Sequence, residues 1–443
     1  MSLERRLRPF MSKVLASIID QATSSTANFV MNVLLARWLA PADYGSFSVS
    51  WSFCLVFAAL HNAMILEPMS VVGPAEYGAG LRGYLQSVRK LNVGVAVTLG
   101  VCAAATGVFY KTPQARQVLF VLALCLPGYL LVLTRRREQY VLDQPLRALQ
   151  ISGAYAIAVL GTLNLLHATS HLSAASALGC IGMALPVALL AGMRRPDTNE
   201  SIVKKLGTDS RAYESTTTGV GPIARAHWKY GRWLFASTLV AFGIPDLQTI
   251  LLSVLVDLKS AGALRALMNF VLPLAQLLTV LSIFCLPRLA RQMKMHGAGR
   301  GLRQTIVFPL AIIVTTLGYL AVLLAFGPLI ERLLYGGRMA AYLGFLPWLA
   351  AAALISSVGT GFSALLRAAQ NSQHQLLAGV TGTATGVIAA LLLLKTHGLE
   401  GAIWSMTLAN AASTGTILGA YLWMIRRQRA SWSHAFHYFR LDC

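Results

Sequence analysis

Long apolar runs recur along almost the whole chain, and Lys or Arg interrupts nearly every one of them. A bilayer hydrocarbon core about 30 Å thick takes roughly 20 apolar residues per helical crossing. With 56% hydrophobic and only 12% charged residues, the chain of 443 residues is too apolar for a soluble core. We therefore expect an all-α polytopic membrane protein. About twelve transmembrane helices are predicted, over residues 14–38, 45–72, 91–110, 117–134, 145–167, 172–193, 231–256, 262–287, 303–326, 342–366, 374–394 and 399–424.

The placement of positive charge predicts the orientation of the chain in the membrane. Of 37 Lys and Arg residues, 29 fall in the termini and the alternate connections that share their side, and seven fall on the opposite side. Arg265 alone lies well inside a segment. Since cytoplasmic loops carry the excess of Lys and Arg, both termini are expected in the cytoplasm. The net charge of +21 is spread over these loops rather than massed on one face, so no nucleic-acid partner is expected.

The second half of the sequence repeats features of the first. Ungapped matches pair Leu34, Leu35, Gly45 and Phe53 with Leu251, Leu252, Gly262 and Phe270. Six helices per half is an even number, so both halves enter the membrane in one direction, related by a pseudo-two-fold axis along the membrane normal. The expected domains are a six-helix bundle over 1–193, a cytoplasmic linker over 194–230, a second bundle over 231–425 and a basic, aromatic cytoplasmic tail over 426–443. Two such bundles favour a transporter.

The sequence carries no motif for catalysis, cofactors or metals. It has no GxxxxGK[ST] or HExxH motif, and no two of its six cysteines have metal-ligand spacing. Residues Gly78–Gly83 fit GxGxxG, but no strand precedes them, so they indicate a cytoplasmic turn. We expect a protein that is not an enzyme, with no catalytic residue, no cofactor and no metal.

Polar side chains inside the apolar segments are the candidate functional residues, because unpaired charge in hydrocarbon is costly and normally faces protein or water. Candidates for substrate binding are Arg265, Asn269, Asn28, Asn32, Arg37, Arg367 and His61. Candidates for ion coupling are Asp20, Asp246 and Glu67. Each type of residue has a structural alternative. Asn side chains can simply bond helices together, Arg265 and Asp246 can lock two helices, and Arg37 and Arg367 can snorkel to the interface.

Three stretches resemble polysaccharide-transport proteins. They are Leu35-Ala36-Arg37-Trp38-Leu39-Ala40-Pro41-Ala42-Asp43-Tyr44-Gly45-Ser46-Phe47, Leu333-Leu334-Tyr335-Gly336 and Gly398-Leu399-Glu400-Gly401-Ala402. Together with the two halves, they make most of the chain similar to the lipid-linked oligosaccharide flippases (O-antigen flippase-like). These belong to the multidrug/oligosaccharidyl-lipid/polysaccharide (MOP) exporter superfamily. The resemblance implies a bacterial inner-membrane protein with a cavity lined chiefly by helices one, two, seven and eight.

The resemblance also implies a function. The protein would turn a polyprenyl-diphosphate-linked oligosaccharide, an exopolysaccharide or O-antigen repeat unit, from the inner to the outer leaflet by alternating access. Arg265, with Arg37 and Arg367, would meet the diphosphate. Expected partners are this glycan lipid, membrane lipid, a polysaccharide polymerase and a chain-length regulator. The alternatives are a cation-coupled multidrug exporter that uses Asp20 or Asp246, and a membrane glycan polymerase or ligase.

Overall fold

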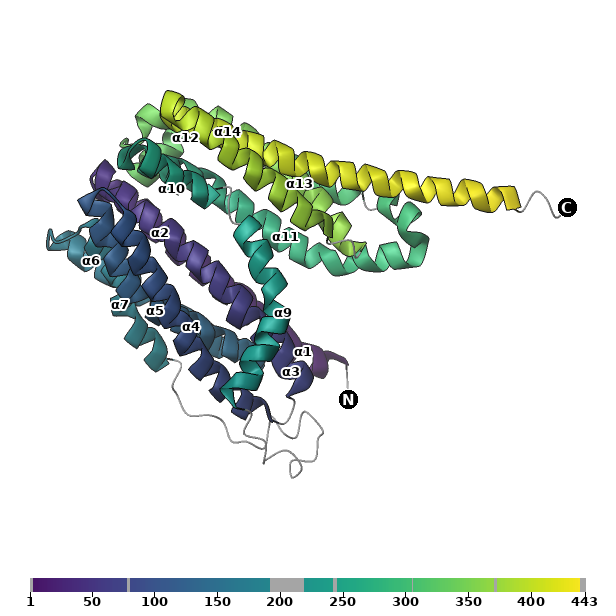
Figure 1. Ribbon diagram of the computed structural model, residues 1–443, viewed down its shortest axis with the longest axis horizontal. Coiled ribbons are helices and arrows are strands. Elements are labelled where there is room, and N and C mark those ends of the chain that lie inside the picture. Colours follow the sequence, from purple (N-terminus) through teal and green to yellow (C-terminus); the bar gives the residue numbers. More distant parts are fainter. Residues whose placement is uncertain are drawn as a thin grey trace. The chain divides into compact units, whose positions relative to one another are not determined.

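The computed structural model describes residues 3–77, 80–191, 219–241, 245–304, 306–369 and 373–438. Every element in these ranges is a helix, and the chain divides into two compact units, residues 1–239 and 240–443 (Figure 1). Nine helices among the described residues are long and apolar enough to cross a membrane. The all-α polytopic fold is therefore confirmed, whereas twelve crossings in two symmetry-related bundles stay a prediction. Most of the predicted linker, residues 194–218, lies outside the described residues.

Several helices of unit 1 begin at proline. Proline is the first residue of three of these helices, where its fixed φ favours the helix and its missing N–H needs no partner. The packed pairs include α4 with α5, α1 with α6, and α7 with both α5 and α6. The helices are α1 (Leu3–Trp38), α2 (Pro41–His61), the π-helical turn η1 (Asn62–Leu66), α3 (Glu67–Glu76), α4 (Leu81–Phe109), α5 (Pro113–Val141), α6 (Pro145–Ala168), α7 (Ala174–Ala191) and most of α9 (Val220–Ala241).

Unit 2 contains two glycines whose backbone conformation ends or breaks a helix. Gly336 caps α12 with φ 65°, and Gly398 interrupts α14 with φ 52° and ψ −125°. The break at Gly398 lies between the predicted segments that end at 394 and begin at 399. The elements are α10 (Pro245–Leu255), α11 (Leu258–Gln304), α12 (Val307–Tyr335), the 3₁₀ turn η3 (Ala340–Phe345), α13 (Leu346–Ala368) and α14 (Gln373–Tyr438). The side chains of the predicted tail from 427 onward lie outside the description.

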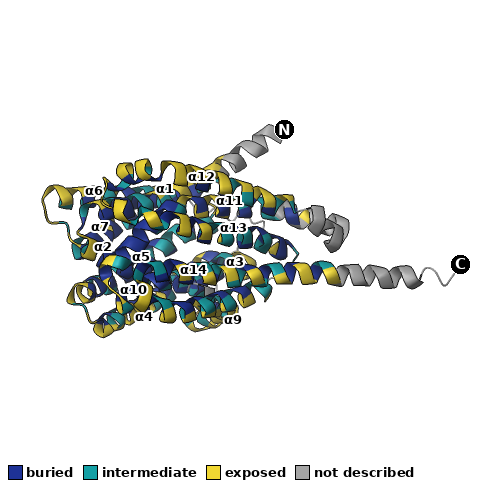
Figure 2. Cartoon of the chain, turned by 90° about the horizontal axis from the view of Figure 1, so that it is seen from above, coloured by how far each residue is buried: buried dark blue, intermediate teal, exposed yellow. Residues whose placement is uncertain are grey.

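The outer faces of the helices are apolar and their contacts use small residues. Exposed residues line the outer faces of the helices (Figure 2). Among them, Leu124 is 83% exposed and Ile157 is 76% exposed, as suits side chains that a bilayer solvates. Between α5 and α7, a Cβ on Gly182 would lie 2.7 Å from the Sγ of Cys125. The absence of a side chain at this glycine lets the two backbones approach closely, as is common in membrane helices.

The turn η1 lies within the span Pro41–Glu76, shortly before a proline that interrupts the helical hydrogen bonds. Pro68 lacks an N–H, so the carbonyl of Met64 four residues earlier loses its usual helical donor. Helix α9 supplies a replacement, because the Nδ1 of His227 lies 3.2 Å from that oxygen. The Nε2 of the same ring lies 2.8 Å from the hydroxyl of Tyr84. One turn later along α9, a Cβ on Gly231 would lie 2.6 Å from the carbonyl oxygen of Ala63.

Candidate functional site

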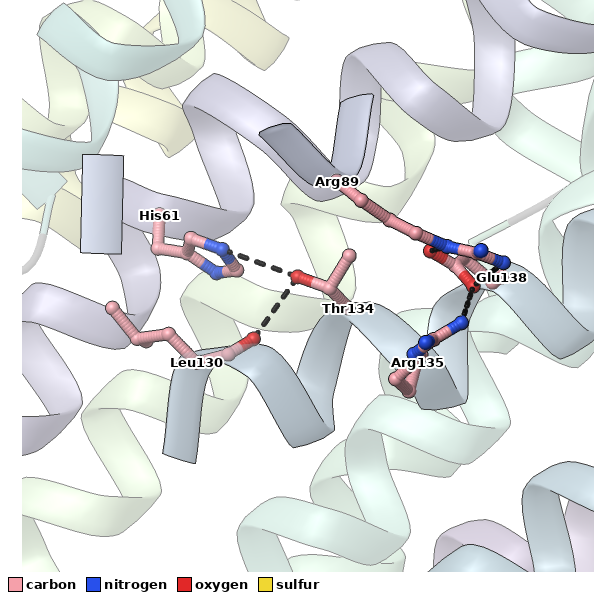
Figure 3. Close-up of polar contacts among 6 residues, drawn as sticks. All are labelled: His61, Arg89, Leu130, Thr134, Arg135 and Glu138. Atoms are coloured by element: carbon pink, nitrogen blue, oxygen red, sulfur yellow. Dashed lines mark hydrogen bonds and ion pairs between the residues drawn. The ribbon is translucent and has the colours of Figure 1, made fainter. Parts of the chain in front are cut away.

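The charged end of α5 joins three other elements of unit 1. Arg136 bonds to Asp20 of α1, and Arg137 donates to the Oδ1 of Asn62 in η1 over 3.4 Å. Glu138 accepts two hydrogen bonds from Arg89 of α4 (Figure 3). Consecutive residues of a helix point in different directions, about 100° apart, so one short run can hold three neighbours.

Asp20 is completely buried and is neutralised by Arg136. Its Oδ2 lies 2.9 Å from the Nε and 2.8 Å from the Nη2 of Arg136, and it also accepts a hydrogen bond from the hydroxyl of Tyr140. A carboxylate among membrane helices requires such compensation. The Oδ1 is buried and has no hydrogen-bond partner among the described residues. A coupling cation at Asp20 would therefore share the carboxylate with an arginine.

His61 ends α2 and is buried against two neighbouring helices. Its Nε2 lies 2.6 Å from the Oδ1 of Asn92 in α4. The same nitrogen lies 3.4 Å from the Oγ1 of Thr134 in α5 (Figure 3). Thr134 in turn donates to the carbonyl of Leu130. The ring thus ties α2 to α4 and α5. Glu67 is half-buried at the first residue of α3, and within the described ranges no hydrogen bond or ion pair joins it or His61 to Asp20.

In unit 2 the structure brings together Asp246 and Arg265. Asp246 lies in the first turn of α10, and its Oδ1 is 3.1 Å from the Nη1 of Arg265 in α11. Both side chains are only 10% exposed. The Nε of Arg265 is buried and finds no acceptor in the described part of the chain. The pair therefore compensates its own charge while the guanidinium keeps donors for a further group.

Asn269 follows Arg265 by four residues and so lies on the same face of α11. Its Nδ2 donates to the hydroxyl of Tyr335 in α12 over 3.2 Å. The same hydroxyl donates to the carbonyl of Ala266 over 3.0 Å. Tyr335 therefore fixes the Asn269 amide one turn beyond the ion pair.

The other candidates lie apart from these clusters. Asn32 donates from Nδ2 to the carbonyl of Asn28 over 2.8 Å, a bond inside α1. Arg37 is exposed in the last turn of α1, and Arg367 is exposed in the last turn of α13. These terminal positions are those where long cationic side chains snorkel to the interface. The described residues hold no cluster of three or more potential metal-binding side chains of His, Cys, Asp or Glu.

No protein-family model and no curated protein matches the sequence. Similar proteins are found by comparing the structure with solved structures. An inward-facing multidrug resistance MATE transporter of the MOP superfamily superimposes with a TM-score of 0.71 at 13% identity, covering 94% of this chain and 98% of its own. The lipid II flippase MurJ, in an inward closed conformation, gives 0.67 at 12% identity over 97% and 93%. A MOP superfamily transporter from Pyrococcus furiosus gives 0.61 at 13% identity over 96% of each. The chain has the MOP-superfamily fold.

The MOP fold agrees with the resemblance that the sequence showed. Identities of 12% to 13% establish the fold alone, so the substrate has to be argued from the residues of this chain. The fold does not test the roles of the ten candidate residues, which stay predictions.

Sequence reasoning missed the partners of the buried charges. Arg89 and Arg136 enter the sequence analysis only among the Lys and Arg of the cytoplasmic connections. Glu138 and Asn92 are not singled out there, and Tyr335 enters only as part of a stretch that carries the family resemblance. One signal was available: Glu138 directly follows three arginines, and a carboxylate in such a run indicates local pairing as well as orientation. The pairing of Arg136 with Asp20 spans 116 residues, and no local pattern encodes it.

Proposed function

We propose that the protein is a MOP-type transporter that turns a polyprenyl-diphosphate-linked oligosaccharide from the inner to the outer leaflet of the bacterial inner membrane by alternating access. The glycan is an exopolysaccharide or O-antigen repeat unit. The resemblance at residues 35–47 to polysaccharide-transport proteins supports this substrate class. One neighbour of the same fold is named a lipid II flippase.

The observation that carries the proposal is the incomplete bonding of Arg265. Its guanidinium gives one hydrogen bond to Asp246, and its Nε is buried without an acceptor among the described residues. Arginine presents five N–H donors in a planar fork that fits phosphate oxygens in pairs. Asp246 orients the fork, and a diphosphate supplies the missing acceptors. Charge-assisted bonds of this kind are the stronger class of hydrogen bond.

A cation-coupled multidrug exporter of the same fold is the second candidate. The neighbour with the TM-score of 0.71 is a MATE multidrug transporter, and the buried Oδ1 of Asp20 finds no partner among the described residues. In this alternative, a proton or a cationic drug occupies the carboxylate. Transport of cationic dyes, with no movement of glycan lipid, would favour it.

The test compares three variants in proteoliposomes that contain a fluorescent polyprenyl-diphosphate-linked oligosaccharide. Arg265→Gln removes the charge but leaves Asp246 buried without its partner, so Arg265→Gln/Asp246→Asn is measured beside it. Arg332→Gln, at an exposed arginine of α12, is the control. If Arg265 contacts diphosphate, both the single and the double variant slow flipping about tenfold or more. Wild-type flipping by the double variant would instead make Arg265 a structural lock on Asp246.

A further inference from the structure

Helices α4 and α5 of unit 1 form an open apolar groove along their seam. Its volume is about 390 Å³, and every lining residue is apolar, including Gly100 and Ala104 of α4 with Leu124 and Pro127 of α5. A Cβ on Gly100 would lie 2.9 Å from the Cγ of Pro127, so the absence of a side chain there helps to keep the helices close. Such a volume falls within the range of about 300–1,000 Å³ typical of small-ligand sites.

A pair of arginines shares one carboxylate at the charged end of the same two helices. The Nε and Nη2 of Arg89 each lie 2.9 Å from an oxygen of Glu138, and the Nη1 of Arg135 lies 3.2 Å from Oε2 (Figure 3). Glu138 is fully buried, whereas the side chains of Arg89 and Arg135 are 41% and 40% exposed. Two positive charges meet one negative charge, so one positive charge is uncompensated within this cluster. Each guanidinium has more N–H donors than it gives to Glu138.

The groove and the arginine pair lie along the same seam between α4 and α5. Gly100 follows Arg89 by 11 residues, and Pro127 precedes Glu138 by 11 residues. Eleven residues are close to three full helical turns, so both pairs are nearly aligned on their helices and are separated by about 16 Å along the axis. Half the hydrocarbon thickness of a bilayer is about 15 Å. When the arginines lie at the depth of the lipid headgroups, this spacing places the groove at the depth of the lipid acyl chains.

We propose that the α4–α5 seam binds one anionic phospholipid of the surrounding bilayer. The lipid phosphate accepts hydrogen bonds from Arg89 and Arg135, and one acyl chain lies in the apolar groove. The phosphodiester of phosphatidylglycerol carries one negative charge, which matches the one uncompensated positive charge. A diphosphate carries at least two charges and fits less well, which is why the seam is assigned to a bilayer lipid rather than to the transported glycan lipid. Basic pockets between membrane helices on the cytoplasmic side are known to take anionic headgroups.

The experiment measures lipid binding to full-length, delipidated protein in detergent, and it needs no transport. Native mass spectrometry counts the phosphatidylglycerol and phosphatidylcholine retained after each is titrated. Arg135→Gln leaves the Arg89–Glu138 pair intact, and Ala104→Phe fills the groove. The matched controls are Lys229→Gln of α9 and Val108→Phe of α4, two exposed positions outside the arginine pair and the groove lining.

We expect wild-type protein to retain phosphatidylglycerol over phosphatidylcholine by roughly fivefold, the effect of one cationic side chain near a headgroup. Arg135→Gln should lose this preference, Ala104→Phe should lower retention of both lipids, and both controls should behave as wild type. Equal retention of the two lipids by wild type, or an unchanged preference in Arg135→Gln, would overturn the proposal. Displacement of bound phosphatidylglycerol by substoichiometric polyprenyl diphosphate would also overturn it and assign the seam to the glycan lipid.

Discussion

Asp20 shows how a buried charge is held among the helices of unit 1. Its carboxylate is fully buried and bonded to Arg136, whose side chain is 17% exposed. Removal of one partner of a desolvated pair leaves an uncompensated charge and costs more than removal of both. The apolar pattern of the first helix could predict that Asp20 faces inward. It could not predict which of 37 basic residues would meet it, because that choice is made by tertiary packing.

Asp20→Asn should lower the free energy of unfolding by about 3 kcal/mol, because Arg136 loses its counter-charge. The double variant Asp20→Asn/Arg136→Gln should recover part of that loss. Thermal unfolding in detergent, followed by fluorescence-detected size exclusion, measures both. Asp143→Asn is the control: Asp143 pairs with Lys13 at a 62% exposed position, and its loss should cost less than about 1 kcal/mol. The single variant Arg136→Gln is measured as well, and a double variant as unstable as the sum of the two single variants would contradict the pairing.

At the scale of elements, α9 is held against η1 by a close backbone approach at Gly231. Gly231→Ala should destabilise unit 1 by about 2 kcal/mol, because the new Cβ would lie 2.6 Å from the backbone oxygen of Ala63. Gly221→Ala, in the same helix with open space around it, should be neutral or stabilising by up to about 1 kcal/mol. The melting temperatures of the two variants give the comparison. Equal melting temperatures would rule out the contact.

The break in α14 depends on the backbone of Gly398. Its φ of 52° with ψ of −125° lies in a region that L side chains rarely adopt. Gly398→Ala should therefore lower stability by about 1–3 kcal/mol. Gly415→Ala, at a helical position with open space, should not. A Gly398→Ala variant as stable as Gly415→Ala would indicate that α14 does not break there.

Helical elements were the part of the fold that the sequence could predict. Apolar runs of membrane length fix where helices lie, and Gly398 marks a boundary between two of them. The π turn was not predicted, because Pro68 can equally kink a helix or end it. In the structure, His227 of α9 supplies a donor to the Met64 carbonyl from 163 residues away, a long-range contact that no local pattern predicts.

For the whole molecule, the charge distribution predicts which connections face the cytoplasm. Lys13 near the start of α1 pairs with Asp143 in the connection between α5 and α6, so these two places share one side. The connection at Ser170, between α6 and α7, should lie on the other side. In a variant without native cysteines, Ser170→Cys should react with a membrane-impermeant maleimide on intact cells, and Gln144→Cys should react only after lysis. Reversed labelling would invert the topology.

The central claim is that the protein moves a lipid-linked glycan across the bilayer. The most direct test follows the leaflet exposure of a polyprenyl-diphosphate-linked oligosaccharide in proteoliposomes with wild-type protein, with Arg265→Gln/Asp246→Asn and without protein. The account predicts protein-dependent movement that is slowed about tenfold or more in the double variant. No movement under any imposed proton or Na⁺ gradient, from protein that is folded by size exclusion and extrudes cationic dyes, would contradict the flippase and favour the drug exporter.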